Sequence, residues 1–307
     1  PGRSLAMAGL SLRTRHDGGG FVQTVKAAQG QAAGLFAREE WEKQVGSERP
    51  ELGSDTPLAG LPPQTLDALA PLFSVDVVRR SLDVVRESSV VELAIDTGTV
   101  AADDRRADFC EIELELKSGA PRGLFDLARE LDALVSLRLG VVTKSERGYR
   151  LLDAVAESAK AAAIPLAPDQ HIAGGFAAIA GACMRQYRLN EDIVLRRRSP
   201  EALHQARVGL RRLRSALTLF KPVVEDERYS HFRDELKWLA RELGDVRDLD
   251  VLYDRARSSE LRIAISRLRE GAYGALEETL GSARARALMI DLAEWVAVGA
   301  WRDADQT

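Results

Sequence analysis

Hydrophobic and polar positions alternate with a period of two residues through much of the first half of the chain. The alternation covers "LSLRTR" at 10–15 and "FVQTVKA" at 21–27, and "DGGG" between them predicts a hairpin turn. A third alternating segment covers 37–45. Three more strands are predicted, at "SVDVVRRSLDVV", at "SVVELAIDTGTV" with a turn at its "DTG", and at "EIELELK". The pattern indicates antiparallel strands with one charged and one apolar face.

Helical periodicity occurs between the third and fourth of these strands and again after the last one. "PQTLDALAPLF" predicts a short helix, and "GLFDLARELDALVSLRL" predicts an amphipathic one because its leucines recur at i, i+3, i+7 and i+10. Pro165 and Pro168 then interrupt the chain. Four more helices are predicted at roughly 170–195, 200–220, 230–257 and 260–298. We therefore expect an α+β protein, with a β domain at 1–155, a linker at 156–168 and an all-α helical bundle at 169–307.

Composition and charge narrow the class of protein. The 307 residues are 45% hydrophobic and 29% charged, which suits ordinary globular cores. A net charge of -4 argues against a nucleic-acid-binding surface over the whole chain, yet residues 171–221 hold ten Arg or Lys against three acidic residues. This basic block predicts an anion site. No membrane span is expected, and two distant cysteines, Cys110 and Cys183, fit a reducing cytoplasm.

Basic and acidic residues are segregated strand by strand. Arg13 and Arg15 share one strand face, and three glutamates share another, at 111, 113 and 115. For a single strand, such a face is ordinarily just solvated. Together, the segregated faces favour a closed β-tunnel with a charged lumen, in which basic side chains bind phosphate oxygens and carboxylates bind a hard divalent cation.

In their order, "LSLRTRHDGGGFVQTVKA", "REEWE", "VELAIDTG" and "EIELELKSG" resemble the CYTH domain, the fold of the triphosphate tunnel metalloenzymes. The resemblance implies an eight-stranded antiparallel tunnel that binds inorganic triphosphate or a related polyphosphate. Most members hydrolyse it with a divalent metal, here expected to be Mg²⁺ or Mn²⁺. Some members are adenylate cyclases or thiamine-triphosphatases.

The same resemblance implies roles for particular residues. The phosphate-binding positions are Arg13, Arg15, Lys26, Arg38, Lys144 and one of Arg79 and Arg80, whose strand face stays open. The expected catalytic residues are Glu111, Glu113 and Lys26, and the metal-site carboxylates are Glu111, Glu113 and Glu115, with Glu92, Glu40 and Glu42 as further candidates. The family's ExExK run on its first strand is not found: either the first strands precede Pro1 in the natural protein or this member lacks them, and with them metal binding and hydrolysis. Because the sequence starts without Met and almost at once in a strand pattern, we expect the natural N-terminus to lie upstream of Pro1.

A second basic pattern lies on helices. At about 100° per residue, one helical stripe holds His204, Arg207, Arg211 and Arg214, beside an apolar face of leucines. Lys237 and Arg241 form a similar stripe on the next helix. Solvated, ion-paired faces are the ordinary alternative.

This region resembles the CHAD domain, a conserved-histidine α-helical domain that binds inorganic polyphosphate and commonly follows CYTH in bacterial chains. The matching segments are "HQARVGLRRLR" and "LKWLARELGDVRDLDVL". The resemblance implies polyphosphate binding by His204, Arg207, Arg211, Arg212, Arg214, Lys237 and Arg241. Such domains usually have two four-helix units, and we expect this chain to hold about one, with more sequence beyond residue 307.

Two functions are therefore weighed. The first is metal-dependent hydrolysis of inorganic triphosphate in the tunnel, with polyphosphate held by the helices. The alternative is a non-catalytic polyphosphate-binding protein with a degenerate tunnel. Nucleic-acid binding is disfavoured because no aromatic residues are interleaved with the arginines of the basic block.

Overall fold

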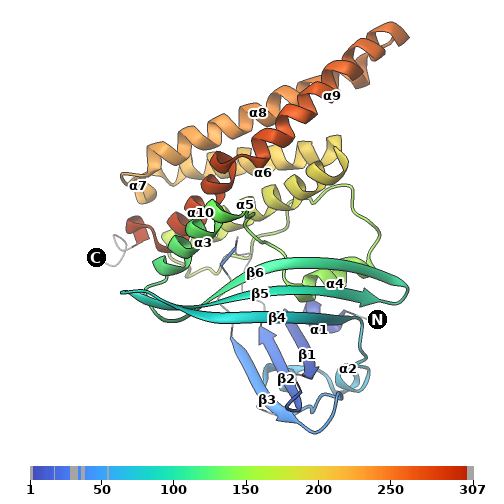
Figure 1. Ribbon diagram of the computed structural model, residues 1–307, viewed down its shortest axis with the longest axis vertical. Coiled ribbons are helices and arrows are strands. Elements are labelled where there is room, and N and C mark those ends of the chain that lie inside the picture. Colours follow the sequence, from blue (N-terminus) through green and yellow to red (C-terminus); the bar gives the residue numbers. More distant parts are fainter. Residues whose placement is uncertain (1–2, 17, 28–33, 36–38, 54, 303–307) are drawn as a thin grey trace.

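A computed structural model describes residues 3–16, 18–27, 34–35, 39–53 and 55–302. The strands precede the long helices along the chain, and they form two three-stranded antiparallel sheets (Figure 1). The strands of the first sheet, in spatial order, are β1 (Leu10–His16), β2 (Phe21–Ala27) and β3 (Glu40–Val45). Those of the second are β4 (Ser74–Val85), β5 (Ser89–Ala102) and β6 (Arg105–Gly119). The described residues thus form two separate sheets and no closed eight-stranded wall.

The hairpin predicted between the first two strands is confirmed. Gly18 and Gly20 have φ of 86° and 142°, which glycine adopts without the steric penalty that a Cβ brings. β1 and β2 pair with Arg13 opposite Thr24, so the polar residues of both strands share one face. The third strand, predicted over 37–45, begins at Glu40 in the structure. Residues 37 and 38 of the predicted range lie outside the described residues.

The turn predicted at "DTG" was wrong. β5 runs without a break through these residues, and the turn to β6 lies at 103–104, where Asp103 has φ of 53°. Gly98 is needed for close packing, since a Cβ there would lie 2.2 Å from the carbonyl oxygen of Asp76 and 2.9 Å from the Phe109 ring. Glycine in such a sequence usually indicates a turn. Here Gly98 lies within the strand, where its missing side chain leaves room for the neighbouring strand and the Phe109 ring.

The helices that follow residue 170 lie on one side of the second sheet, whereas α1 (Ser4–Met7) and α2 (Pro63–Asp67) lie beside the first sheet on its other side (Figure 1). The long helices are α3 (Arg122–Leu134), α4 (Lys144–Leu152), α5 (Ile172–Arg197), α6 (Pro200–Leu219), α8 (Tyr229–Arg255), α9 (Ser259–Gly281) and α10 (Ala283–Val298). The other short ones are η1 (Pro57–Gly60), α7 (Lys221–Val224) and η2 (Ala300–Arg302). The Ser199 hydroxyl accepts a hydrogen bond from the Ala202 amide, as the predicted start of α6 requires.

The single helix predicted over 260–298 is two helices. Ser282 ends α9 with extended backbone, and its hydroxyl accepts from the amide of Ala285 at the start of α10. The apolar period continues across this cap, so periodicity alone could not place the break.

α3, although it follows the strands, packs with the helical domain. It contacts α10, and Phe125 belongs to the same buried cluster as Phe176 and Trp295. Arg129 of α3 pairs with Asp291 of α10 at 2.7 Å and with Glu294. The two halves of the chain are therefore joined through α3.

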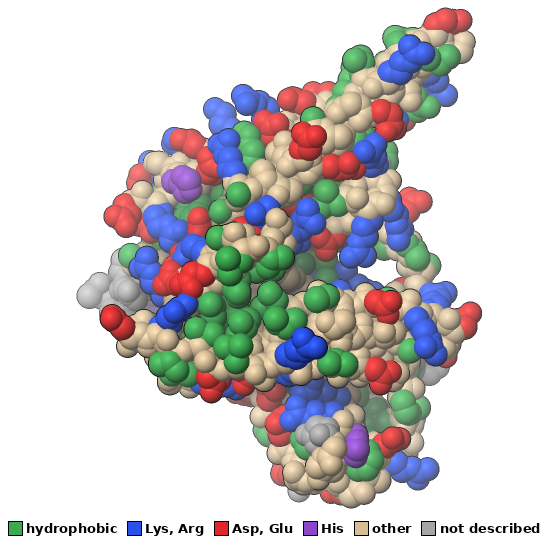
Figure 2. Space-filling model, viewed as in Figure 1, with side chains coloured by type: hydrophobic (Ala, Val, Ile, Leu, Met, Phe, Trp, Pro, Cys, Tyr) green, Lys and Arg blue, Asp and Glu red, His purple; other side chains and the backbone are tan. Residues whose placement is uncertain are grey.

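The surface is mixed in charge, with Lys and Arg side chains interspersed with Asp and Glu over the face shown in Figure 2. Among the described residues, no helix combines the length and hydrophobicity that a bilayer-spanning segment needs. Both cysteines are free, Cys110 exposed and Cys183 buried.

Candidate functional site

Three carboxylates meet on the charged face of the second sheet. Asp96 of β5 lies opposite Glu111 of β6, and Glu113 follows two residues along the same strand. One carboxylate oxygen from each residue lies within 4.8 Å of those of the other two. The Asp96 side chain has no exposed surface, whereas that of Glu113 is about half exposed. The cluster (Asp96, Glu111 and Glu113) is thus buried at one end and open at the other.

Cations from both sides hold this cluster. Arg79 of β4 donates to Asp96 through Nε at 2.8 Å and Nη2 at 2.6 Å, and it also pairs with Glu113 at 2.5 Å. The Lys144 ammonium lies 2.7 Å from Asp96, 2.5 Å from Glu111 and 2.6 Å from Glu113. A single lysine therefore contacts all three carboxylates.

Local structure fixes Lys144 in place. It is the first residue of α4, whose N-terminus is capped by the Thr143 hydroxyl accepting from the amide of Glu146. Gly148, one turn on, allows α4 to press against Phe73, since a Cβ there would lie 2.2 Å from the ring. One turn after Lys144, Arg147 pairs with Glu111 at 3.0 Å.

The ionisation of the cluster follows from these contacts. Burial opposes the charge on Asp96, but hydrogen bonds from Arg79 and Lys144 outweigh burial and lower its pKa. Burial likewise opposes the charge on Glu113, and the hydrogen bond from Lys144 leaves its pKa lowered. The Lys144 pKa is raised despite burial, because the three carboxylates favour its charged form. These two carboxylates are therefore ionised, as metal or cation binding requires.

The first sheet presents a complementary charged face. The Thr24 hydroxyl accepts from Arg13 Nε at 3.3 Å and donates to Glu42 at 2.8 Å. Arg15 also lies 3.7 Å from Glu42. Lys26 pairs with Glu40 at 2.5 Å on the next rung. Basic side chains of β1 and β2 thus pair with acidic side chains of β3.

The two charged faces influence one another. Burial and the neighbouring Arg15 lower the pKa of Arg13, while the carboxylates of Glu40, Glu42 and, on the other sheet, Glu113 act to raise it. A carboxylate of the second sheet therefore acts on a cation of the first.

Some sequence candidates lie elsewhere. Arg80 is paired with Ile95 in the register and points to the face opposite Arg79, since successive strand residues alternate. Glu115 and Glu92 each pair with Lys117 at 2.9 Å, outside the cluster. Arg38 lies outside the described residues.

Sequence reasoning missed two members of this site. The predicted metal-site carboxylates do not include Asp96, and the predicted phosphate-binding positions do not include Arg147. The signal for Arg147 was its spacing of three residues from Lys144, which puts both on one side of a helix.

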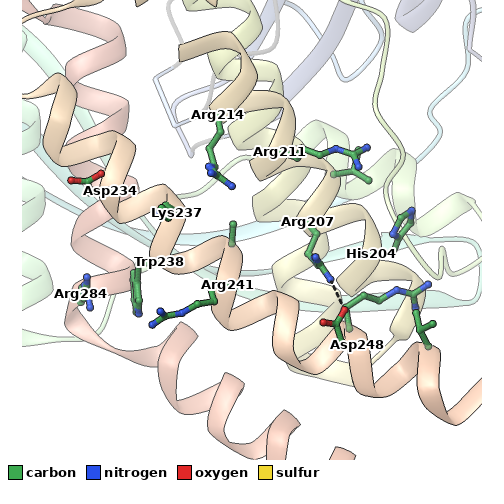
Figure 3. A pocket seen from close by; sticks show the side chains of 14 residues that line it. His204, Arg207, Arg211, Arg214, Asp234, Lys237, Trp238, Arg241, Asp248 and Arg284 are labelled. Atoms are coloured by element: carbon green, nitrogen blue, oxygen red, sulfur yellow. Dashed lines mark ion pairs between the residues drawn. The ribbon is translucent and has the colours of Figure 1, made fainter. Parts of the chain in front are cut away.

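A second cluster of cations lines a groove in the helical domain, with a volume of about 1020 Å³. Figure 3 shows Arg207, Arg211 and Arg214 along α6, with Lys237 and Arg241 on α8. The full set of charged residues and histidine lining the groove is His204, Arg207, Arg211, Arg214, Asp234, Lys237, Arg241, Arg247, Asp248 and Arg284. Seven Arg or Lys thus face two Asp, which gives the groove a net positive charge.

Several of these cations have no acidic partner. Within the part of the chain that the structure describes, no carboxylate lies within ion-pair distance of Arg211, Arg214 or Lys237. Arg207 lies 3.7 Å from Asp248, which is largely exposed (dashed in Figure 3). The ordinary alternative, a solvated face of paired charges, therefore does not describe the centre of the groove.

The groove also contains residues that the sequence stripes did not include. Arg284 of α10 stacks over the Trp238 ring, 3.8 Å from its centroid, and is held by Glu235 through two contacts of 2.7 Å. The sequence indicates Arg284 only as a basic residue just after Ser282, where the predicted single helix is in fact broken. Arg212, by contrast, does not line the groove, because it turns toward α5 and donates to Gln186 at 2.8 Å.

The fold and the two charged sites define a protein of two parts, a β domain with opposed charged sheet faces and a helical bundle with a basic groove. Residues 1–149 match the family model of the CYTH domain, and residues 178–307 match that of the CHAD domain. The chain is therefore a CYTH domain followed by a CHAD domain.

Two known proteins are similar. An inorganic triphosphatase of Haemophilus influenzae is 32% identical over 156 residues, which cover 49% of this chain and 43% of that protein. The matched region thus spans less than half the length of this curated relative. The crystal structure of the CHAD domain from the plant Ricinus communis is 36% identical, covers 45% of this chain and 50% of its own, and superposes with a TM-score of 0.42.

Proposed function

We propose that this chain hydrolyses inorganic triphosphate between its two charged sheet faces, with a divalent metal. The observation that carries the proposal is the meeting of Asp96, Glu111 and Glu113 within 4.8 Å, with Arg79 hydrogen-bonded to Asp96 and Glu113. Similarity to an inorganic triphosphatase supports the choice of substrate. The cytoplasm, where such polyphosphates would be met, also suits its free cysteines.

The donor set fits a hard cation. Three carboxylates supply only oxygen ligands, which Mg²⁺ and Mn²⁺ prefer, and the open end at Glu113 leaves room for substrate oxygens. When a divalent cation is bound, the chemistry it supplies is polarisation of a phosphoryl oxygen and activation of water. Lys144, which already contacts all three carboxylates, is the cation nearest to such a site.

The chain's own residues would bind and orient the substrate. Arg13, Arg15 and Lys26 on the first sheet neutralise phosphate oxygens, and Arg79 does so from the second. Fixed cations on opposite walls hold the phosphate chain extended, so that a terminal phosphoryl group faces the carboxylates. Charge that develops on the leaving phosphate is then stabilised by groups already in place.

The basic groove would bind polyphosphate. Its unpaired cations, Arg211, Arg214 and Lys237, lie on two facing helices and match the repeated charges of a phosphate chain. The same observation favours the second candidate, a non-catalytic polyphosphate-binding protein, should the β domain prove inactive.

Phosphate release from triphosphate, with Mg²⁺ or Mn²⁺, tests the enzyme. We expect turnover by the chain to fall by roughly 10²–10³-fold when Glu111→Gln and Glu113→Gln are combined. A matched control combines Glu87→Gln with Glu130→Gln, two exposed glutamates of the same half, and should keep full turnover. Equal turnover in both double variants would overturn the metal site, and no turnover with either metal would leave polyphosphate binding as the function.

A further inference from the structure

The first helix of the helical domain contacts the segment that carries Lys144. Arg185 of α5 is largely buried, with 16% of its side chain exposed. Its guanidinium donates to the carbonyl oxygen of Val141 and to the carboxylate of Glu146. One turn further along α5, Arg188 donates from Nε to the carbonyl oxygen of Leu139 at 3.0 Å. The two arginines thus hold the chain on both sides of the α4 N-terminus.

This segment depends on such anchors. Residues 135–143 contain no helix or strand, so their backbone carbonyls have no regular partners. Glu146 lies in the first turn of α4, where its amide donates to the cap at Thr143. Arg185 therefore binds the first turn of α4 at Glu146 and the preceding loop at Val141. It does so because the planar guanidinium can donate to two acceptors at once.

The opposite side of α4 faces the acidic cluster. Lys144 contacts Asp96, Glu111 and Glu113, and Arg147 contacts Glu111. Glu146 lies two residues from Lys144, which is about 200° around the helix. Arg185 therefore binds α4 on one side, and Lys144 points to the carboxylates from the other side.

We propose that Arg185 is a positioning residue for the β-domain site: through Glu146 and Val141 it fixes the placement of Lys144 between the three carboxylates. The helical domain is thereby part of the site on the sheets, in addition to binding anions in its own groove. The proposal rests on the proposed function only for its activity readout.

A simpler role for Arg185 would be to join the two domains. The chain offers a matched comparison, because Arg129 joins α3 to α10 through Asp291 and Glu294, and among the described residues its ion pairs are all with residues outside α4. A substitution that merely loosens the domains should act alike at Arg129 and Arg185. A positioning role predicts that only Arg185 affects α4.

Hydrogen exchange of the full chain provides the first test. In Arg185→Met we expect amides of residues 144–152 to exchange at least about tenfold faster than in the wild type, while Arg129→Met leaves them unchanged. Arg185→Lys keeps the positive charge but loses one of the two hydrogen bonds, so its exchange rate in α4 should lie between those of the wild type and Arg185→Met. Unchanged exchange of α4 in Arg185→Met, or an equal change in Arg129→Met, would overturn the proposal. This readout needs no catalytic activity, so it decides the matter even if the chain hydrolyses nothing.

A double-mutant cycle with Lys144→Met provides the second. If Arg185 acts through Lys144, Arg185→Met lowers kcat for triphosphate about tenfold in the wild-type background and has little further effect in Lys144→Met. Independent, multiplying losses would contradict action through Lys144. Should Arg185→Met not fold, Glu146→Gln breaks the same contact from the α4 side and enters the same cycle, with Arg150→Met, which removes the other partner of Glu146 at 2.9 Å, as its control.

Discussion

The ammonium of Lys144 lies 2.7 Å from the carboxylate of Asp96, whose side chain has no exposed surface. Arg79 holds the same carboxylate from the neighbouring strand at 2.6 Å. A buried carboxylate is tolerated only when it is paired and hydrogen-bonded, and here both cations come from different elements. Asp96 is therefore the residue that ties β4, β5 and α4 into one unit.

Asp96→Asn should destabilise the protein, because it keeps the shape but removes the charge that two cations face. We expect the free energy of unfolding to fall by about 2–3 kcal/mol, as for hydrogen bonds to a buried charged group. Urea denaturation measures this. The control is Asp83→Asn, an exposed aspartate of β4, which should change the free energy by less than about 0.5 kcal/mol. Equal values for the two variants would contradict the role assigned to Asp96.

Acid should destabilise the protein through the same contacts. Burial raises the pKa of Asp96 and Glu113, but cationic partners leave both pKa values lowered. A lowered carboxyl pKa contributes stability above the unfolded value, near 4, and this stability is lost as pH falls through the folded value. The free energy of unfolding should therefore decline below about pH 4.

Lys144→Met should flatten that acid decline, since it removes a cation that lowers both pKa values. Urea denaturation between neutral pH and about pH 3 measures the slope. Lys117→Met, which removes a lysine from the exposed pairs with Glu92 and Glu115, is the control and should keep the wild-type slope. A slope that is just as steep in Lys144→Met would show that the cluster does not govern the acid response.

The local parts of this site could be predicted from sequence, because a two-residue period places Glu111 and Glu113 on one face whatever surrounds them. Their partner Asp96 could not, because its position depends on where the hairpin turns. With a turn at "DTG", Asp96 would lie in a loop. With the turn at Asp103, it lies opposite Glu111.

In the groove, too, residues placed by a local period could be predicted and residues placed by tertiary packing could not. The stripe of Arg207, Arg211 and Arg214 follows from the period of α6 alone, and these residues do line the groove. Arg284 comes from α10, after a helix break that the continuous apolar pattern concealed. Arg212 is only one position from Arg211 on the helix, and packing against α5 decided its direction.

Glu294 should control how the two domains unfold. Its side chain is 3% exposed and lies 3.0 Å from Arg228, and it also pairs with Arg129 of α3. Burial opposes its charge, but hydrogen bonds from these two arginines leave its pKa lowered. Glu294→Gln should lower the free energy of unfolding by about 2–3 kcal/mol.

Calorimetry should also show that the single thermal transition of the wild type splits into two in Glu294→Gln, since this change weakens the coupling of α3 to the bundle, although the pair of Arg129 with Asp291 remains. Glu277→Gln, which removes a glutamate paired with Arg198 at the more exposed rim of the bundle, is the control and should leave one transition. A single, unshifted transition in both variants would show that coupling does not run through Glu294.

Polyphosphate binding should depend on the unpaired cations of the groove. Combining Arg211→Ala, Arg214→Ala and Lys237→Ala should weaken binding of a long polyphosphate at least about tenfold, or about 1.4 kcal/mol, because each cation loses a charge-assisted contact. The dependence of affinity on salt should also decrease, since fewer counterions are released.

The control for the groove removes three positive charges elsewhere in the helical domain, with Arg255→Ala, Arg257→Ala and Arg267→Ala, all exposed and outside the groove. Calorimetric titration of polyphosphate into both triple variants separates a specific groove from general attraction. Because net charge falls equally, a loss confined to the groove variant assigns binding to the facing helices. Equal losses in both would show that only overall charge attracts the polyanion, and the groove would then carry no binding function.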